Sequence, residues 1–309
     1  MNPIDELAQS LSCLESTDGN TFQRKARVLQ ALWRVEEGYP IGHHRGREIG
    51  SCLAMPWAEE TLANFLDDDI RDVVTEVLHH HSGPDRRVIE RRRLFSNLLS
   101  SQPLAFNLFA HLKLDTALAT RAFSALTEGR IANVTAVEFE FSPGRGDDRY
   151  TGDNSAFDVY IKFDTPAGLP GFAGVEVKYH ENLEDKPARH RARYDEVARQ
   201  MGIFTRESYP SLRLAPLQQI WRDHLLCGAH RTADAFSDGL FIFLNPQGND
   251  ACNRAVSAYS RGLTAVDTFV HLTLEDLVST LHTFTKSAWL DRFADRYTNF
   301  AKIDRTLGL

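Results

Sequence analysis

The first hundred residues place their apolar side chains at helical spacing. In residues 68–79, one helical face is formed at i, i+3 and i+4 by Ile70, Val73, Val74, Val77 and Leu78. The same spacing, interrupted by breaks that contain glycine or proline, predicts further helices over 21–38, from residue 85 to 99, over 104–112 and over 115–126. We therefore expect a helical N-terminal region.

From residue 133 onward the pattern changes to that of β-strands. Residues 134–141, 157–163, 172–179 and 239–244 are rich in β-branched and aromatic side chains, which predicts four strands. In residues 157–163 (FDVYIKF), every second residue from Phe157 onward is apolar, and every second residue from Asp158 onward belongs to the other set. The two sets should lie on opposite faces of the strand. Helices are predicted over 191–202 and 216–227. A helix–strand–helix tail, whose last helix contains Trp289 and Phe300, closes the chain.

This order of elements indicates the fold class. Three successive strands favour antiparallel hairpins, and a strand that follows two helices can return parallel into the same sheet. The prediction is an α/β (α+β) fold, with a mixed central sheet of about four to five strands flanked by helices. We place a helical region at residues 1–100, followed by a domain over 101–309 that includes the helical tail.

The composition is that of an ordinary globular protein, with 42% hydrophobic and 25% charged residues among 309. No apolar run approaches the ~18 residues of a membrane helix, and the acidic start, MNPIDELAQS, does not resemble a secretory signal. The four cysteines form no C-x-x-C pair, so we expect buried thiols and a cytoplasmic protein. A net charge of -7 argues against non-specific coating of nucleic acid, although basic residues can still be confined to one groove.

The segment GVEVKYH contains the first candidate chemistry. Glu176 and Lys178 lie two residues apart, so a β-strand points both side chains to the same face. A carboxylate and an ammonium on an apolar strand are costly to bury unless they are paired or bound to a metal. The alternative is an exposed ion pair worth less than ~1 kcal/mol.

The preceding strand favours the metal hypothesis. Asp158 opens that strand on its polar face, after a loop rich in glycine and aspartate. If the two strands form a hairpin, Asp158 lies near Glu176, and two carboxylates with one lysine suit a divalent cation that prefers oxygen ligands. Such a cation lowers the pKa of a bound water and neutralises phosphate charge, while a lysine can position the water or stabilise developing charge.

In this order of elements and in these residues, the chain resembles the PD-(D/E)xK, or restriction-endonuclease-like, superfamily. It is most similar to a group of bacterial proteins described as PD-(D/E)xK nuclease-like. The runs that support this resemblance, which extends from about Arg27 to Leu244, are RLFSNLLSSQPLAFNLF, VEFEFSPGR, TGDNSAFDVYIKF, GVEVKYHE and PLQQIWRDHLL. Phe157 stands where the superfamily's name has a proline, a position at which the superfamily is tolerant.

The resemblance implies an Mg²⁺-dependent nuclease, with Mn²⁺ as a substitute cation and DNA as the expected substrate. Asp158 and Glu176 would be metal ligands, the Val177 carbonyl a further ligand, and Lys178 the catalytic lysine. We expect an endonuclease of bacterial defence. The alternative on the same fold is a non-catalytic nucleic-acid-binding or assembly module of a defence or repair system, and a third class is a binding protein for a small acidic or nucleotide ligand.

Several further residues are candidates for the same site. Glu140 alternates with apolar neighbours on the first strand, where it is either solvated or an additional metal- or water-positioning group. Related enzymes present a helix to the substrate after the third strand. A phosphate clamp or, alternatively, a solvated basic face is therefore expected at Arg189, Arg191 and Arg193, and the resemblance places Tyr194 and Gln219 in the same cleft.

Two further basic stretches have a weaker basis. A second cluster, which could contact DNA, consists of Arg86, Arg87, Arg91, Arg92 and Arg93. The histidines at 79–81 diverge around a helix, so we interpret them as structural.

A homodimer or a partner protein is compatible with the sequence, but no residue identifies its interface.

Overall fold

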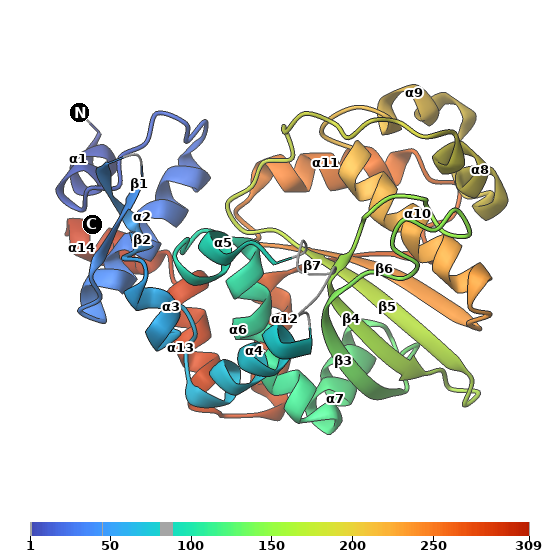
Figure 1. Cartoon of the computed structure of the whole chain (residues 1–309), viewed down its shortest axis with the longest axis horizontal. Coiled ribbons are helices and arrows are strands. Elements are labelled where there is room, and N and C mark those ends of the chain that lie inside the picture. Colours follow the sequence, from blue (N-terminus) through green and yellow to red (C-terminus); the bar gives the residue numbers. More distant parts are fainter. Residues whose placement is uncertain (1, 45, 81–88, 309) are drawn as a thin grey trace. The chain divides into compact units, whose positions relative to one another are not determined.

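The computed structural model describes residues 2–44, 46–80 and 89–308. The chain folds into two compact units (Figure 1). The first consists of Met1–His111 together with Thr285–Leu309, and the second of Leu112–Phe284. Each unit has its own packed interior and is described separately.

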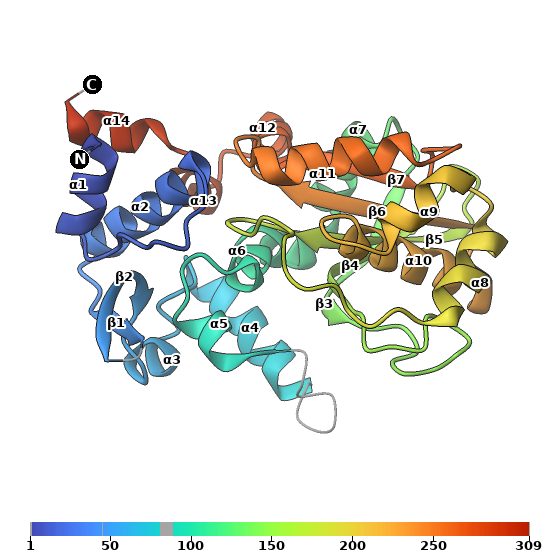
Figure 2. The ribbon, with the colours of Figure 1, turned by 90° about the horizontal axis from the view of Figure 1, so that it is seen from above.

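The first unit is mainly helical. Its elements are α1 (Pro3–Ser10), α2 (Thr21–Glu36), β1 (Ile41–His44), β2 (Arg47–Leu53), α3 (Trp57–Thr61), α4 (Asp68–His80), α5 (Arg91–Phe95), most of α6 (Ser101–Leu114), α13 (Ala288–Tyr297) and α14 (Ala301–Leu307). The chain ends return to each other, because α14 packs against α1 and α2 (Figure 2). A single tail helix through Phe300 was predicted, but the chain divides there into α13 and α14.

A buried arginine joins α13 to α2 in this unit. The Arg296 guanidinium lies 3.8 Å from the ring centroid of Trp33 and is fully buried. It donates hydrogen bonds to Gln30 Oε1 at 3.1 Å and to the Asn64 carbonyl at 2.8 Å. The charge is therefore hydrogen-bonded and stacked on an aromatic ring, as a guanidinium needs when it is removed from water.

The predicted helical region also contains a β-hairpin that the sequence pattern did not predict. Ile41–His44 and Arg47–Leu53 form the antiparallel β1–β2 hairpin. Of the helix expected up to residue 99, the described residues 89–99 form only Arg91–Phe95 as an α-helix. Gly42 permits the close pairing, since a Cβ there would lie 2.4 Å from the Leu53 carbonyl oxygen. Of the second basic cluster, Arg86 and Arg87 lie outside the described residues, while the Arg92 side chain donates to the His43 carbonyl at 2.9 Å.

The second unit contains the predicted sheet. Its elements are α7 (Thr116–Leu126), β3 (Asn133–Phe141), β4 (Phe157–Asp164), β5 (Pro170–Val177), α8 (Ala192–Met201), α9 (Tyr209–Leu212), α10 (Gln218–Ala233), β6 (Asp238–Asn245), α11 (Asp250–Arg261), β7 (Phe269–Thr273) and α12 (Leu274–Phe284). The strand order is β3-β4-β5-β6-β7. The first three strands are antiparallel, and β6 and β7 add in parallel, which confirms the mixed five-stranded α/β fold.

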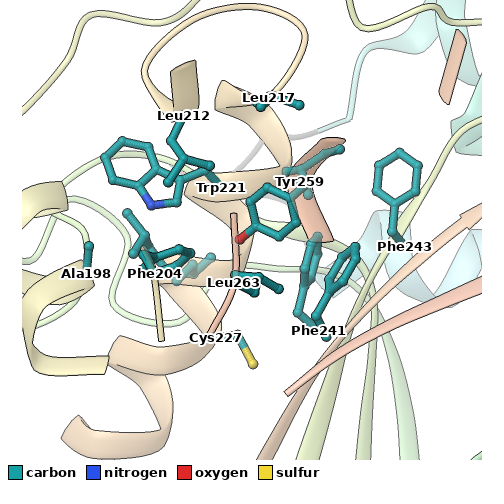
Figure 3. Close-up of a cluster of buried hydrophobic side chains, with 14 of the residues drawn as sticks. Ala198, Phe204, Leu212, Leu217, Trp221, Cys227, Phe241, Phe243, Tyr259 and Leu263 are labelled. Atoms are coloured by element: carbon teal, nitrogen blue, oxygen red, sulfur yellow. The ribbon is translucent and has the colours of Figure 1, made fainter. Parts of the chain in front are cut away.

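Helices cover the sheet on both faces. Helix α10 packs on β5 and β6, whereas α7 packs on β3 and against α12. On the α10 side, aromatic rings fill the space between helix and sheet (Figure 3), among them Phe204, Trp221, Phe241 and Tyr259. Burial on both faces explains why β6 reads as a continuous apolar run and not as an alternating one.

Strand β4 begins irregularly. Alternation predicted that Phe157 lies on the face of Val159, but its ring lies 6.3 Å from the ring of Tyr160, on the α10 side. There it covers Gly174 of β5, where an added Cβ would be 2.4 Å from Phe157 Cε1. Gly174 pairs with Tyr160 across the strands, so the absence of a side chain at 174 makes room for Phe157 immediately before Asp158.

Replacement of Gly174 by alanine should therefore destabilise the second unit. The added methyl group must displace the fully buried Phe157 ring, and overpacking of this kind costs about 1–3 kcal/mol. We expect Gly174→Ala to unfold at lower urea concentration than the parent protein. Gly19→Ala is the control, because its Cβ meets nothing nearer than Gln23 Oε1 at 3.6 Å. Equal midpoints for the two variants would show that Phe157 is not held over Gly174.

Candidate active site

Three carboxylates line up across neighbouring strands. Val159 pairs with Phe139 on one side and with Val175 on the other. One residue further along the same register, Glu140, Asp158 and Glu176 stand at the same level of β3, β4 and β5. The Val177 amide also donates to Asp158 Oδ2 at 2.7 Å, which ties the start of β4 to the end of β5.

Lys178 follows the last residue of β5 and pairs with Glu176. Its ammonium lies 2.6 Å from Glu176 Oε1, and the two side chains are only 9% and 7% exposed. A second lysine–glutamate pair on the sheet, Lys162 with Glu138, has a similar distance of 2.7 Å but side chains that are 43% and 36% exposed. The exposed pair matches the ordinary surface ion pair, whereas the buried pair is screened from water and interacts more strongly.

The neighbouring charges shift the pKa values of these groups. Burial, and then the nearby Glu176 and Glu140, raise the pKa of Asp158 well above its ordinary value. Burial disfavours the charged form of Lys178, but Glu176, Glu181 and Asp158 outweigh it and raise the pKa of its ammonium. Negative charge is therefore concentrated at this end of the sheet, and Lys178 remains protonated within it.

Glu140 has an unusual backbone conformation. Its φ of 52° lies in the left-handed region, although it is inside strand β3 and its side chain is buried. A residue with a Cβ occupies this region at a cost on the order of 1–2 kcal/mol. Such conformations cluster at functional sites.

Gln219 and Tyr194, predicted to lie in the substrate cleft, both bind acidic side chains. Gln219, near the start of α10, donates from Nε2 to Glu176 Oε1 at 2.6 Å. The Tyr194 hydroxyl, on α8, donates to Asp153 Oδ2 at 2.6 Å. Gln219 thus holds the same carboxylate oxygen as Lys178, which makes it a positioning residue for Glu176.

The three arginines of the predicted clamp differ in their surroundings. Arg193 is engaged in local structure, donating to the Tyr150 carbonyl at 2.8 Å and pairing with Glu196 at 3.1 Å. Arg189 and Arg191 are exposed and border a pocket at the start of α8.

Two residues of α10 were missed by the sequence prediction. Asp223 is almost fully buried, and its Oδ2 has no hydrogen-bond partner among the residues that the structure describes. Burial and then Glu176 raise the pKa of Asp223 well above its usual value. Arg222 lies between Asp153 and Asp223, with Nε at 3.7 and 4.0 Å from their carboxylates. The spacing of Gln219, Arg222 and Asp223, at i, i+3 and i+4, was a usable signal, since such residues share one helix face.

The comparison with protein families agrees with this geometry. The profile of the PD-(D/E)XK nuclease superfamily matches residues 17–299, which is nearly the whole chain. The chain belongs to the PD-(D/E)XK nuclease superfamily. Neither the curated proteins nor the solved structures that were searched contain a match.

Members of the PD-(D/E)XK superfamily typically use a divalent metal, and the donor set here fits one. In the described ranges, no three histidine, cysteine, aspartate or glutamate side chains form a ready ligand cluster. Asp158 and Glu176, however, each use one carboxylate oxygen in their hydrogen bonds, Oδ2 and Oε1, and the second oxygens accept no hydrogen bond from the described residues. A cation would also offset the repulsion that raises the pKa of Asp158.

Two further predictions concerned membrane-spanning helices and the cysteines. The helices of the described residues include none that is long and apolar enough to cross a membrane. All four cysteines are unpaired thiols. Cys13, Cys227 and Cys252 are buried, as predicted, whereas Cys52 is half-buried.

Loss of the Gln219 hydrogen bond should weaken divalent-cation binding without unfolding the protein. In Gln219→Leu, Glu176 keeps Lys178 but loses its second donor, and partners of metal ligands typically contribute 10–100-fold to metal affinity. Titration calorimetry with Mn²⁺ should show a dissociation constant raised by roughly tenfold. Gln200→Leu, on the exposed face of α8, should bind Mn²⁺ like the parent protein. Equal Mn²⁺ affinity in both variants would remove the positioning role of Gln219.

Proposed function

We propose that this protein hydrolyses phosphodiester bonds of nucleic acid in a divalent-cation-dependent reaction, with DNA as the expected substrate and Mg²⁺ as the expected cation. The observation that supports this most directly is the juxtaposition of Asp158, Glu176 and Lys178 at one end of the sheet. Membership in the PD-(D/E)XK superfamily supports the same reaction. A purely binding protein has no need of a buried lysine between metal-binding carboxylates.

Each residue has a role that follows from its chemistry. Asp158, Glu176 and the Val177 carbonyl would hold the cation, which supplies a water of lowered pKa and neutralises phosphate charge when bound. Lys178, kept protonated by its acidic neighbours, can stabilise negative charge that develops on the phosphate oxygens through Nζ. Glu140, at the level of Asp158, can orient the attacking water.

The same proposal assigns the basic residues that follow β5 to substrate binding. Arg189 and Arg191 are exposed at the start of α8, where guanidinium groups can bind backbone phosphates. Arg193 would act on the substrate less directly, because it is bonded to the carbonyl groups of Arg149 and Tyr150.

The decisive experiment separates catalysis from metal binding at Lys178. Lys178→Ala removes no ligand, so Mn²⁺ should still bind, but plasmid nicking with Mg²⁺ or Mn²⁺ should fall by a factor on the order of 10²–10³. Glu176→Ala should lose both metal binding and nicking. Lys178→Arg should restore little activity, since the guanidinium is larger and differs in hydrogen-bond geometry.

Lys162→Ala is the matched control for these variants. Lys162 is also a lysine paired with a glutamate on the sheet, but it is exposed and lies away from the carboxylate row. Lys162→Ala should nick plasmid at the parental rate, and EDTA should stop the parent protein. If Lys178→Ala cleaves as fast as the parent under saturating Mg²⁺, the proposed mechanism is wrong. If the parent binds DNA and never cleaves it, the non-catalytic alternative holds.

A further inference from the structure

A basic pocket lies between the start of α8 and the first turns of α10. It has a volume of about 680 Å³, within the range of sites that hold a small ligand. Three guanidinium groups line it, from Arg189, Arg191 and Arg222, and polar neutral groups are supplied by Asn154, Ser155 and Tyr194. The excess of positive charge favours an anion.

The guanidinium groups keep donors that can bind a ligand. Among the residues that the structure describes, the side chains of Arg189 and Arg191 have neither a hydrogen bond nor an ion pair. Arg222 forms long ion pairs with Asp153 at 3.7 Å and Asp223 at 4.0 Å, but its buried Nε makes no hydrogen bond to the described residues. Other arginines of this unit are committed, as Arg130 is to Asp238 and Arg213 to Asp195. Guanidinium groups that converge on one cavity and retain unused hydrogen-bond donors are typical of phosphate recognition.

The one acidic residue in the pocket does not compete strongly with an incoming anion. Asp153 already accepts hydrogen bonds from the Tyr194 hydroxyl at 2.6 Å and from the Thr151 hydroxyl at 2.8 Å. It also accepts from the amide and hydroxyl of Ser155, both at 3.0 Å. Its lone pairs are thus largely used, which leaves Arg222 at 3.7 Å without a hydrogen bond to it.

Helix α10 contributes residues to both the pocket and the candidate active site. Gln219, which binds Glu176, and Arg222, which lines the pocket, are three residues apart and therefore neighbours on the helix surface, with Cβ atoms ~5–6 Å apart. Burial lowers the pKa of Arg222, but the carboxylates of Asp223, Asp153 and, more weakly, Glu176 raise it, and together with Tyr194 they outweigh burial. A nucleic-acid strand whose scissile bond lies at the carboxylates can therefore place a neighbouring phosphate in the pocket.

We propose that this pocket binds a phosphate group of the nucleic-acid strand beside the bond that is cleaved, with Arg191 and Arg222 as its ligands. The proposal rests on the nuclease function proposed above and adds a subsite to it. The phosphate can be an internal diester or a terminal monoester, because both present oxygens to a guanidinium fork in the same way.

The test measures binding separately from cleavage. Fluorescence anisotropy with a labelled single-stranded DNA oligonucleotide is recorded in EDTA, with and without a terminal phosphate, for Arg191→Gln and Arg222→Gln. Each variant should bind roughly tenfold more weakly and lower the salt slope by about one unit. Arg199→Gln is the matched control, because Arg199 is exposed on α8 outside the pocket and its side chain donates to the Asp195 carbonyl of that helix.

The outcomes separate the two proposals. Weaker binding of both oligonucleotides supports an internal phosphate, and weaker binding confined to the terminally phosphorylated one supports a terminal phosphate. Arg222→Gln could unfold, since Asp223 loses its nearby charge, and then the exposed Arg191→Gln decides. If the pocket variants bind like Arg199→Gln while the parent protein cleaves DNA, the subsite is wrong and the nuclease function stands. If binding weakens but the parent never cleaves, the nuclease function fails and the phosphate pocket stands.

Discussion

Carboxylates gather around Glu176 at the end of β5, and the ammonium of Lys178 lies beside them. Glu140 and Glu176 act on Asp158, and Glu176 acts on Asp223, while Lys178 bonds directly to Glu176. Like charges gathered in a partly buried place repel each other, and the repulsion grows as water is excluded. The second unit must therefore hold these groups against a force that would separate them.

The fold opposes that force with contacts from three directions. The Val177 amide binds Asp158, Gln219 and Lys178 both bind Glu176, and β5 is fixed between β4 and β6. A bound divalent cation would turn the same repulsion into attraction, which gives a physical reason for a chain of this superfamily to retain it. The buried left-handed Glu140 belongs to the same site, where local strain is tolerated because the surrounding sheet determines the backbone.

Helix α10 connects this site to the rest of the unit. One side of it packs into the aromatic layer through Trp221, and near its start Gln219, Arg222 and Asp223 face the carboxylates and the basic pocket. The packed face sets the rotation of the helix, and that rotation places the polar residues. The interior of the unit and its chemistry thus depend on the same contact between helix and sheet.

Much of the architecture could be predicted from local patterns, because period-two and period-3.6 spacing act over short distances. The strands β3 to β6, the helices α8 and α10, and the change from antiparallel to parallel pairing agree with prediction. The β1–β2 hairpin was not predicted. It depends on close backbone pairing, which glycines such as Gly42 permit, and not on an alternating apolar pattern. The face occupied by Phe157 also escaped prediction, because it depends on the space left above Gly174 in another strand.

The amino-acid sequence by itself predicted that Glu176 and Lys178 share one face, because residues two apart on a strand do so. The two side chains do bond to each other, although β5 ends at Val177. The sequence also supplied Asp158 at the start of the neighbouring strand. Only the tertiary structure decided that Asp158 and Glu140 stand level with Glu176, since this requires the register of three strands. The burial of Asp223 and the position of Arg222 were decided there as well, because the rotation of α10 depends on packing between residues far apart in the chain.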